Sequence, residues 1–223
     1  MISIHVIIDF FAGGLLLTTF LMMGKIRLIP MLRYFAVSSF FLAGLGASMS
    51  LLKEEKDFFI APLATILFKV VFIPLIINFT AKKLPSSNQL KMYFRPATTS
   101  FMFLFVLILS GIIVRNFPVT FDGTFDNPFF FKSLLFISIS LILSGILLTV
   151  IRKDLFSQVL GLLTMENGIA AFGLVTLDGI PIFLEMGISF VIIISTVILA
   201  VLIDRVHEVY TIGDTENLKE LID

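Results

Sequence analysis

The sequence contains no cysteine and only two histidines among its 223 residues. Iron–sulfur clusters are held mainly by cysteine thiolates, so the absence of cysteine excludes thiolate-bound clusters from this chain. Two histidines alone also argue against a haem and against a zinc site built from cysteine and histidine. We therefore expect no metal ligands and no cofactor in this chain, and we expect any redox chemistry to belong to another protein.

Charged residues are also scarce, at 14% of the chain, and sixteen Lys and Arg balance sixteen Asp and Glu. This balance gives no indication of a nucleic-acid partner. Hydrophobic residues make up 58% of the chain, and the mean hydropathy of +1.07 is far above that of a soluble domain. The composition therefore predicts an integral membrane protein whose main surroundings are the lipid bilayer.

Apolar runs of about 20 residues are separated by short polar breaks, and a helix of that length crosses roughly 30 Å of hydrocarbon. The runs are continuously apolar instead of alternating, which favours helices over a β-barrel. We predict an all-α, polytopic bundle of about seven transmembrane helices. Their predicted ranges are 4–23, 36–52, 59–81, 98–117, 129–151, 156–176 and 181–203.

The positions of the basic residues predict the orientation of the bundle. Most Lys and Arg follow the first, third, fifth and seventh apolar runs, and cytoplasmic loops carry such an excess. The N-terminus is therefore predicted outside and the C-terminus in the cytoplasm. We divide the chain into 1–149 with five helices, 150–203 with two helices, and a cytoplasmic tail, 204–223. The residues assigned to the cytoplasmic side are Lys25, Arg27, Arg33, Lys82, Lys83, Lys91, Arg95, Arg152, Lys153, Arg205 and Lys219.

Two residues of opposite charge fall near the middle of apolar runs: Lys69 in the third and Glu166 in the sixth. An ionised residue at the centre of a bilayer costs about 2.5–3.5 kcal/mol on insertion scales, so such residues face the bundle interior, pair, or line watery paths. Two interpretations stay open. The residues form a salt bridge that only fixes helix packing, or they form a proton relay.

Further polar residues accompany this pair. Asn167 directly follows Glu166, and Pro74 lies where it is expected to kink the third helix near Lys69. The seventh run carries one polar stripe at helical spacing. Asp9, about a turn and a half from a helix end, is a weaker candidate because it can reach the interface. The predicted relay residues are Lys69, Glu166 and Glu185, with Asp9, Asn167, Ser189 and Thr196 as supporting residues.

Three segments resemble hydrogenase-4 component E: RKDLFSQVLGLLTMENGIAAFGL, IPIFLEMGISFVIIISTVILAVLIDRVHEVY and DTENLKELID. In that family one membrane glutamate precedes Asn-Gly and a second follows a proline in the next span, and Glu166 and Glu185 match these positions. KVVFIP, from Lys69 to Pro74, is similar as well. The last helices also resemble the K-type subunit of respiratory complex I and the C subunit of multi-subunit sodium/proton antiporters. In those proteins glutamates on adjacent helices belong to the proton path.

The resemblance implies a non-catalytic membrane-arm subunit of a complex I-like assembly, such as an energy-converting nickel–iron hydrogenase or formate hydrogenlyase, in the prokaryotic cytoplasmic membrane. Its partners would be antiporter-like and other membrane-arm subunits and a soluble hydrogenase arm. The nickel–iron centre and the iron–sulfur clusters would belong to those partners. The chain would then be no enzyme by itself but part of an ion-translocating oxidoreductase.

Two other functions fit the same residues. An independent secondary transporter for an ion or a small solute would use the charges to bind its substrate, although no inverted repeat is visible in the sequence. A structural scaffold for antiporter-like neighbours would use the charges only for helix packing.

Overall fold

The computed structural model describes residues 4–53, 60–83, 93–117 and 128–176, and seven single residues between Gly187 and Val201. Every regular element within these ranges is a helix, and six spans are long and apolar enough to cross a membrane. The elements are α1 (Ile4–Met23), α2 (Leu28–Lys53), α3 (Ile60–Thr65), η2 (Ile66–Phe72), α4 (Ile73–Lys83), α5 (Pro96–Asn116), α6 (Pro128–Ile151) and α7 (Leu155–Thr176).

The prediction of an all-α membrane bundle is confirmed. The elements α3, η2 and α4 follow one another directly and together form the predicted third span. Most of the predicted seventh span, 181–203, and the whole tail, 204–223, lie outside the described residues. The seven described residues of the seventh span are all helical.

One helix is longer than predicted: α2 begins at Leu28, whereas the apolar run begins at residue 36. The prediction followed hydropathy and treated Arg33 as part of a loop. Pro30 lies in the first turn of α2, where a missing N–H removes no intrahelical hydrogen bond. Arg33 is exposed on the helix surface, and a long basic side chain there can extend toward the membrane interface.

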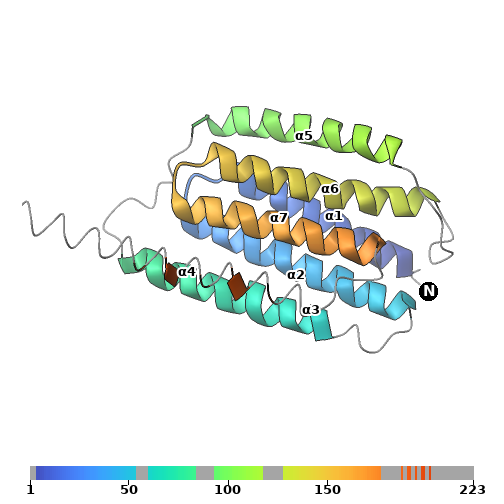
Figure 1. Ribbon diagram of the computed structural model, residues 1–223, viewed down its shortest axis with the longest axis horizontal. Helices are drawn as coiled ribbons and strands as arrows, with labels where there is room; N and C mark the ends of the chain where they lie inside the picture. The colour runs from blue at the N-terminus through green and yellow to red at the C-terminus, as the bar shows by residue number, and fades with distance from the viewer. Residues whose placement is uncertain are drawn as a thin grey trace, which may run out of the picture.

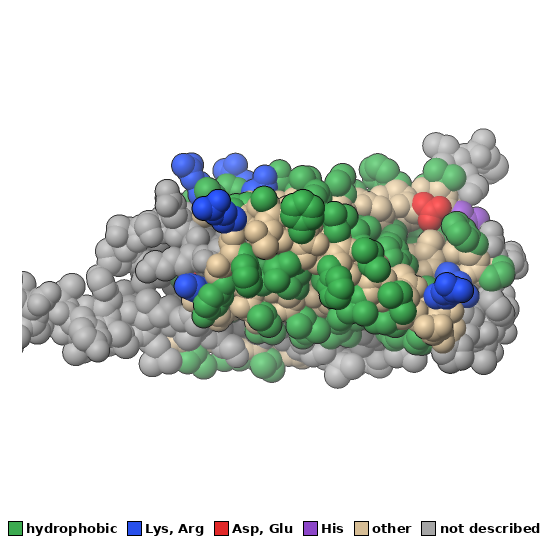
Figure 2. All heavy atoms as spheres, turned by 90° about the horizontal axis from the view of Figure 1, so that it is seen from above, with side chains coloured by type: hydrophobic (Ala, Val, Ile, Leu, Met, Phe, Trp, Pro, Cys, Tyr) green, Lys and Arg blue, Asp and Glu red, His purple; other side chains and the backbone are tan. Residues whose placement is uncertain are grey.

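The helices lie roughly parallel or antiparallel to one another (Figure 1). α5 lies along α6 and α1 at one edge, while α3 and η2 lie along α2 at the opposite edge. Large apolar side chains stay exposed on the outer faces of these edge elements, including Phe101 on α5 and Leu63 on α3, and Figure 2 shows such side chains spread over one long face. Lipid tails are as apolar as these side chains, so a bilayer accommodates the exposed surface.

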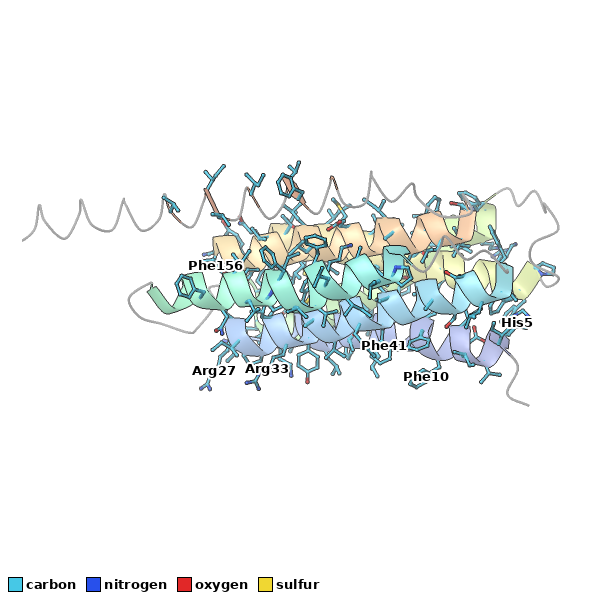
Figure 3. The ribbon with its side chains drawn as sticks, turned by 90° about the horizontal axis from the view of Figure 1, so that it is seen from below. His5, Phe10, Arg27, Arg33, Phe41 and Phe156 are labelled. Atoms are coloured by element: carbon cyan, nitrogen blue, oxygen red, sulfur yellow. The ribbon has the colours of Figure 1, made fainter. Side chains whose placement is uncertain are left out.

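Basic residues gather at one end of the bundle. Figure 2 shows Lys and Arg side chains concentrated at that end, and Figure 3 places Arg27 and Arg33 at the end opposite to His5. The ammonium of Lys25 lies 4.6 Å from the ring centre of Tyr34, and that of Lys153 lies 4.3 Å from the ring centre of Tyr93. This end is the one predicted to face the cytoplasm.

Arg152 differs from the other cations of this end whose side chains the structure describes, because it is fully buried. Its Nη2 donates to the carbonyls of Met23, at 3.0 Å, and Lys25, at 2.7 Å, where α1 ends. A cation stabilises the C-terminal end of a helix, where backbone carbonyls lack intrahelical partners. Burial lowers the pKa of Arg152, and the carboxylate of Asp154 partly opposes this effect. Arg152 therefore lies between α6 and α7, where the sequence placed it, but its burial was not predicted.

Glycines allow the backbones of α6 and α7 to approach closely. A Cβ atom added at Gly145 would meet the backbone of Met165, and one added at Gly168 would lie 2.6 Å from the backbone nitrogen of Ile142. These contacts show that the two helices are antiparallel. They also explain why Gly168 follows the Glu166–Asn167 pair: it allows α7 to pack directly against α6.

Replacing Gly145 by alanine is expected to lower the thermal stability of the protein. The added methyl group meets backbone atoms, which cannot rotate away, so the helices must separate at a cost of about 1–3 kcal/mol. Gly13→Ala is the matched control, because a Cβ at Gly13 meets no atom within 4 Å. Thermal unfolding in mild detergent measures both variants. Equal unfolding temperatures for Gly145→Ala and Gly13→Ala would contradict the close packing of α6 against α7.

Candidate functional site

Lys69 lies in η2, a π-helical segment inside the third span. The N–H of Ile73 donates to the carbonyl of Phe68, five residues earlier, where an α-helix would use the residue four earlier. Pro74 follows at once and has no N–H to donate. The sequence predicted a kink at this proline, and the structure shows a π-helix directly before it. Such segments are rare and occur frequently at functional sites.

The side chain of Lys69 contacts two adjacent residues of α7. Its Nζ lies 3.3 Å from Oε1 of Glu166 and donates a hydrogen bond of 3.2 Å to Oδ1 of Asn167. Lys69 is 1% exposed and Glu166 is 3% exposed. The predicted pairing of Lys69 with Glu166 is therefore present in the structure, in the interior of the bundle.

A residue on a third helix contacts Asn167, and the sequence had not indicated this residue as a candidate. Nδ2 of Asn167 donates to Oγ of Ser39 on α2, at 3.1 Å, and both residues are buried. Hydroxyl residues are frequent in membrane helices, so nothing distinguished Ser39 in the sequence. We call Ser39, Lys69, Glu166 and Asn167 the polar cluster; it connects α2, η2 and α7.

The polar cluster lies near the middle of the span. Glu166 is close to the midpoint of α7, which runs from Leu155 to Thr176. At 1.5 Å per residue, about 15 Å of helix separates Glu166 from either end. This is half of the roughly 30 Å of hydrocarbon that a bilayer presents. The depth predicted for Glu166 therefore agrees with the helix bounds.

Two other buried hydroxyl groups, one on α6 and one on α7, bond to their own helices. Ser144 on α6 donates to the carbonyl of Ser140, and Thr164 on α7 donates to the carbonyl of Leu160. Such hydrogen bonds satisfy a hydroxyl without a partner on another helix. Asn167 and Lys69 differ from them because their polar atoms bond across helices.

Asp9 lies apart from the polar cluster. The contact of Phe11 with Gly44 shows the register of α1 against α2 and places Asp9 level with Gly46. That level is about 10 Å along α2 from Ser39. Asp9 is exposed on the surface of α1, and the structure therefore does not place it in the cluster with Lys69 and Glu166.

The remaining candidates, Glu185, Ser189 and Thr196, lie outside the described residues, so their roles stay predictions. Within the described ranges, no three His, Asp or Glu side chains gather where they could hold a metal ion. The described site therefore consists of one ammonium, one carboxylate, one carboxamide and one hydroxyl group. The carboxylate and the ammonium can take up and release protons, whereas the carboxamide and the hydroxyl group can only donate and accept hydrogen bonds there.

Comparison with known proteins gives full-length relatives. The chain is 22% identical over 221 residues to an uncharacterised protein of Mycobacterium tuberculosis, covering 99% of this chain and 98% of that protein. It is 23% identical over 215 residues to hydrogenase-4 component E of Escherichia coli K12, covering 96% of this chain and 97% of the relative. The match to hydrogenase-4 component E of Shigella flexneri has the same identity and coverage.

No protein-family model and no solved structure matches the chain. The resemblance to hydrogenase-4 component E that the sequence predicted is nevertheless confirmed, and it extends over nearly the whole chain. Together with the six spans in the described residues that are long enough to cross a bilayer, it supports the predicted localisation as a multi-pass protein of the bacterial inner membrane.

Proposed function

We propose that this homologue of hydrogenase-4 component E is a non-catalytic membrane-arm subunit of a complex I-like hydrogenase assembly, and that Lys69 and Glu166 carry one step of a lateral proton path. The similarity to hydrogenase-4 component E over 96% of the chain supports the first part. The observation that carries the second part is the buried contact of 3.3 Å between Lys69 and Glu166.

The proton path is preferred to a purely structural ion pair for an energetic reason. A buried ion pair often fails to offset the cost of removing both charges from water, and hydrophobic residues of similar size pack as well or better. This chain nevertheless carries Lys69 and Glu166 near the centres of two different spans, and Lys69 lies in a π-helix. Intramembrane ionisable residues are common in proton pathways.

The proposed step is a proton exchange at Glu166. A proton that reaches the carboxylate of Glu166 neutralises it and weakens its attraction for the ammonium of Lys69. When that proton leaves, the ion pair forms again, and the site is ready for the next proton. We propose Glu185 on the following span as the neighbouring acid of the path, with Ser189 and Thr196 along the same predicted stripe.

The oxidation and reduction of hydrogen are assigned to other subunits. The chain has no cysteine, and thiolates are the usual ligands of iron–sulfur clusters. We therefore propose that the nickel–iron centre and the clusters lie in a soluble arm, and that antiporter-like subunits adjoin this chain in the membrane.

Purification from native membranes tests the subunit assignment. We expect a C-terminally tagged chain, extracted in mild detergent, to bring antiporter-like membrane proteins and a metal-bearing soluble arm with it, identified by mass spectrometry. A tagged, unrelated multi-pass protein from the same membranes serves as the control. Recovery of only a monomer or homodimer from gently treated membranes would favour an independent transporter instead.

A further inference from the structure

Asn167 uses both ends of its carboxamide inside the bundle. Oδ1 accepts a hydrogen bond from Nζ of Lys69, at 3.2 Å, and Nδ2 donates to Oγ of Ser39, at 3.1 Å. All three residues are buried. Bulk water therefore cannot replace a lost partner of these groups, and losing either hydrogen bond would cost free energy of folding.

The ammonium of Lys69 determines which end of the Asn167 amide faces it, and Ser39 holds the other end. An ammonium group only donates hydrogen bonds, whereas a carboxamide has one accepting end and one donating end. If the amide were rotated by half a turn, its N–H groups would point at the ammonium. The amide is therefore oriented with Oδ1 toward Lys69, and the hydroxyl oxygen of Ser39 accepts the N–H group at the opposite end and anchors the side chain of Asn167 to α2.

Glu166 and Asn167, which both contact Lys69, differ in how they respond to protons. The carboxylate of Glu166 loses its charge when it takes up a proton, whereas the carboxamide of Asn167 neither gains nor loses one near neutral pH. Apart from Glu166 in α7 and Lys69 in η2, these two elements contain no ionisable residue. The ionisable residues of α2, which are Arg33, Tyr34 and Lys53, lie more than one helical turn from Ser39.

We propose that Ser39 and Asn167 are positioning residues that hold the Lys69 ammonium in place while Glu166 gains and loses a proton. This inference rests on the proposed proton path and adds a specific property to it. The charge of the site alternates between zero, with Glu166 ionised, and plus one, with Glu166 neutral. The positive charge that is kept in place stands ready to pair again with the carboxylate of Glu166 once the proton has left, because opposite charges attract strongly in a low-dielectric interior.

Variants at Ser39 separate this role from simple packing. Threonine keeps the accepting hydroxyl group, and valine has nearly the shape of threonine without it. In inside-out vesicles that contain the assembled complex, we expect Ser39→Val to lower the number of ions moved per electron transferred several-fold. We expect Ser39→Thr to restore most of this ratio. Ser39→Ala provides the same test should the valine variant fail to assemble.

A double substitution shows whether Ser39 acts through Asn167. Asn167→Leu is expected to lower the same ratio, and the variant that combines Asn167→Leu with Ser39→Val is expected to lower it no further. Residues that act as one unit give such non-additive effects. Equal ratios for Ser39→Val and Ser39→Thr, or fully additive losses in the double variant, would overturn the inference.

Glu166→Gln, measured in the same vesicles, distinguishes this inference from the proposed function. If Glu166→Gln stops ion movement while Ser39→Val and Ser39→Thr behave alike, the positioning role fails and the proton path stands. If Glu166→Gln moves ions normally, the proton path itself fails, and the positioning role fails with it.

Discussion

Replacing Glu166 by glutamine is expected to abolish ion movement through the assembled complex while the complex still forms. Glutamine has nearly the same size and keeps an acceptor oxygen for Lys69, but it cannot take up or release a proton near neutral pH. The contact at 3.3 Å can therefore persist in the variant without its proton exchange. Acidification of inside-out vesicles, followed with a quenched dye during hydrogen-linked electron transfer, measures the effect.

Thr164→Val is the matched control for this prediction. Thr164 is buried on the same helix, and its hydroxyl donates to the carbonyl of Leu160 at 2.7 Å, away from the polar cluster. This variant removes a buried polar group from α7 and leaves the proposed path intact, so ion movement is expected to continue. Normal pumping by an assembled Glu166→Gln complex would refute the proton path.

Replacing Lys69 by methionine is expected to reduce both ion movement and the stability of the bundle. Methionine fills much of the same volume but leaves the buried carboxylate without its cation, and breaking a buried ion pair in this way costs about 3–5 kcal/mol. Thermal unfolding in detergent, together with the steady-state amount of the subunit in membranes, measures the loss of stability.

The double variant that combines Lys69→Met with Glu166→Met separates stability from function. Removing both charges restores most of the stability, because well-packed apolar side chains replace a buried ion pair at little cost. Ion movement, in contrast, is expected to stay absent. Full activity of the double variant would show that the charges serve only helix packing, and the chain would then be a structural scaffold.

Much of the architecture follows from hydropathy, since a bilayer demands long apolar helices and tolerates few mid-span charges. The predicted bounds of α5, α6 and α7 agree with the structure to within two residues. The pairing of Lys69 with Glu166 was also predictable, because two opposite charges at similar depth lower their cost by meeting in the interior.

Other features depend on contacts that one sequence does not reveal. Ser39 is one of several serines in apolar runs, and only the packing of α2 against α7 brings it to Asn167. Arg152 follows an apolar run like any loop cation, yet the end of α1 lies where its guanidinium can bind two carbonyls. The π-helix around Lys69 was not predicted either: Pro74 indicated a kink, and the structure shows a π-helical segment before it that packs against α2.

Difference infrared spectroscopy of the assembled complex tests most directly whether Glu166 gains and loses a proton as the complex works. We expect a protonated-carboxyl band that appears during turnover, is absent in Glu166→Gln, and persists in Thr164→Val. If the unmodified complex and the Glu166→Gln complex gave the same spectrum in the carboxyl region, the proposed proton exchange at Glu166 would be contradicted.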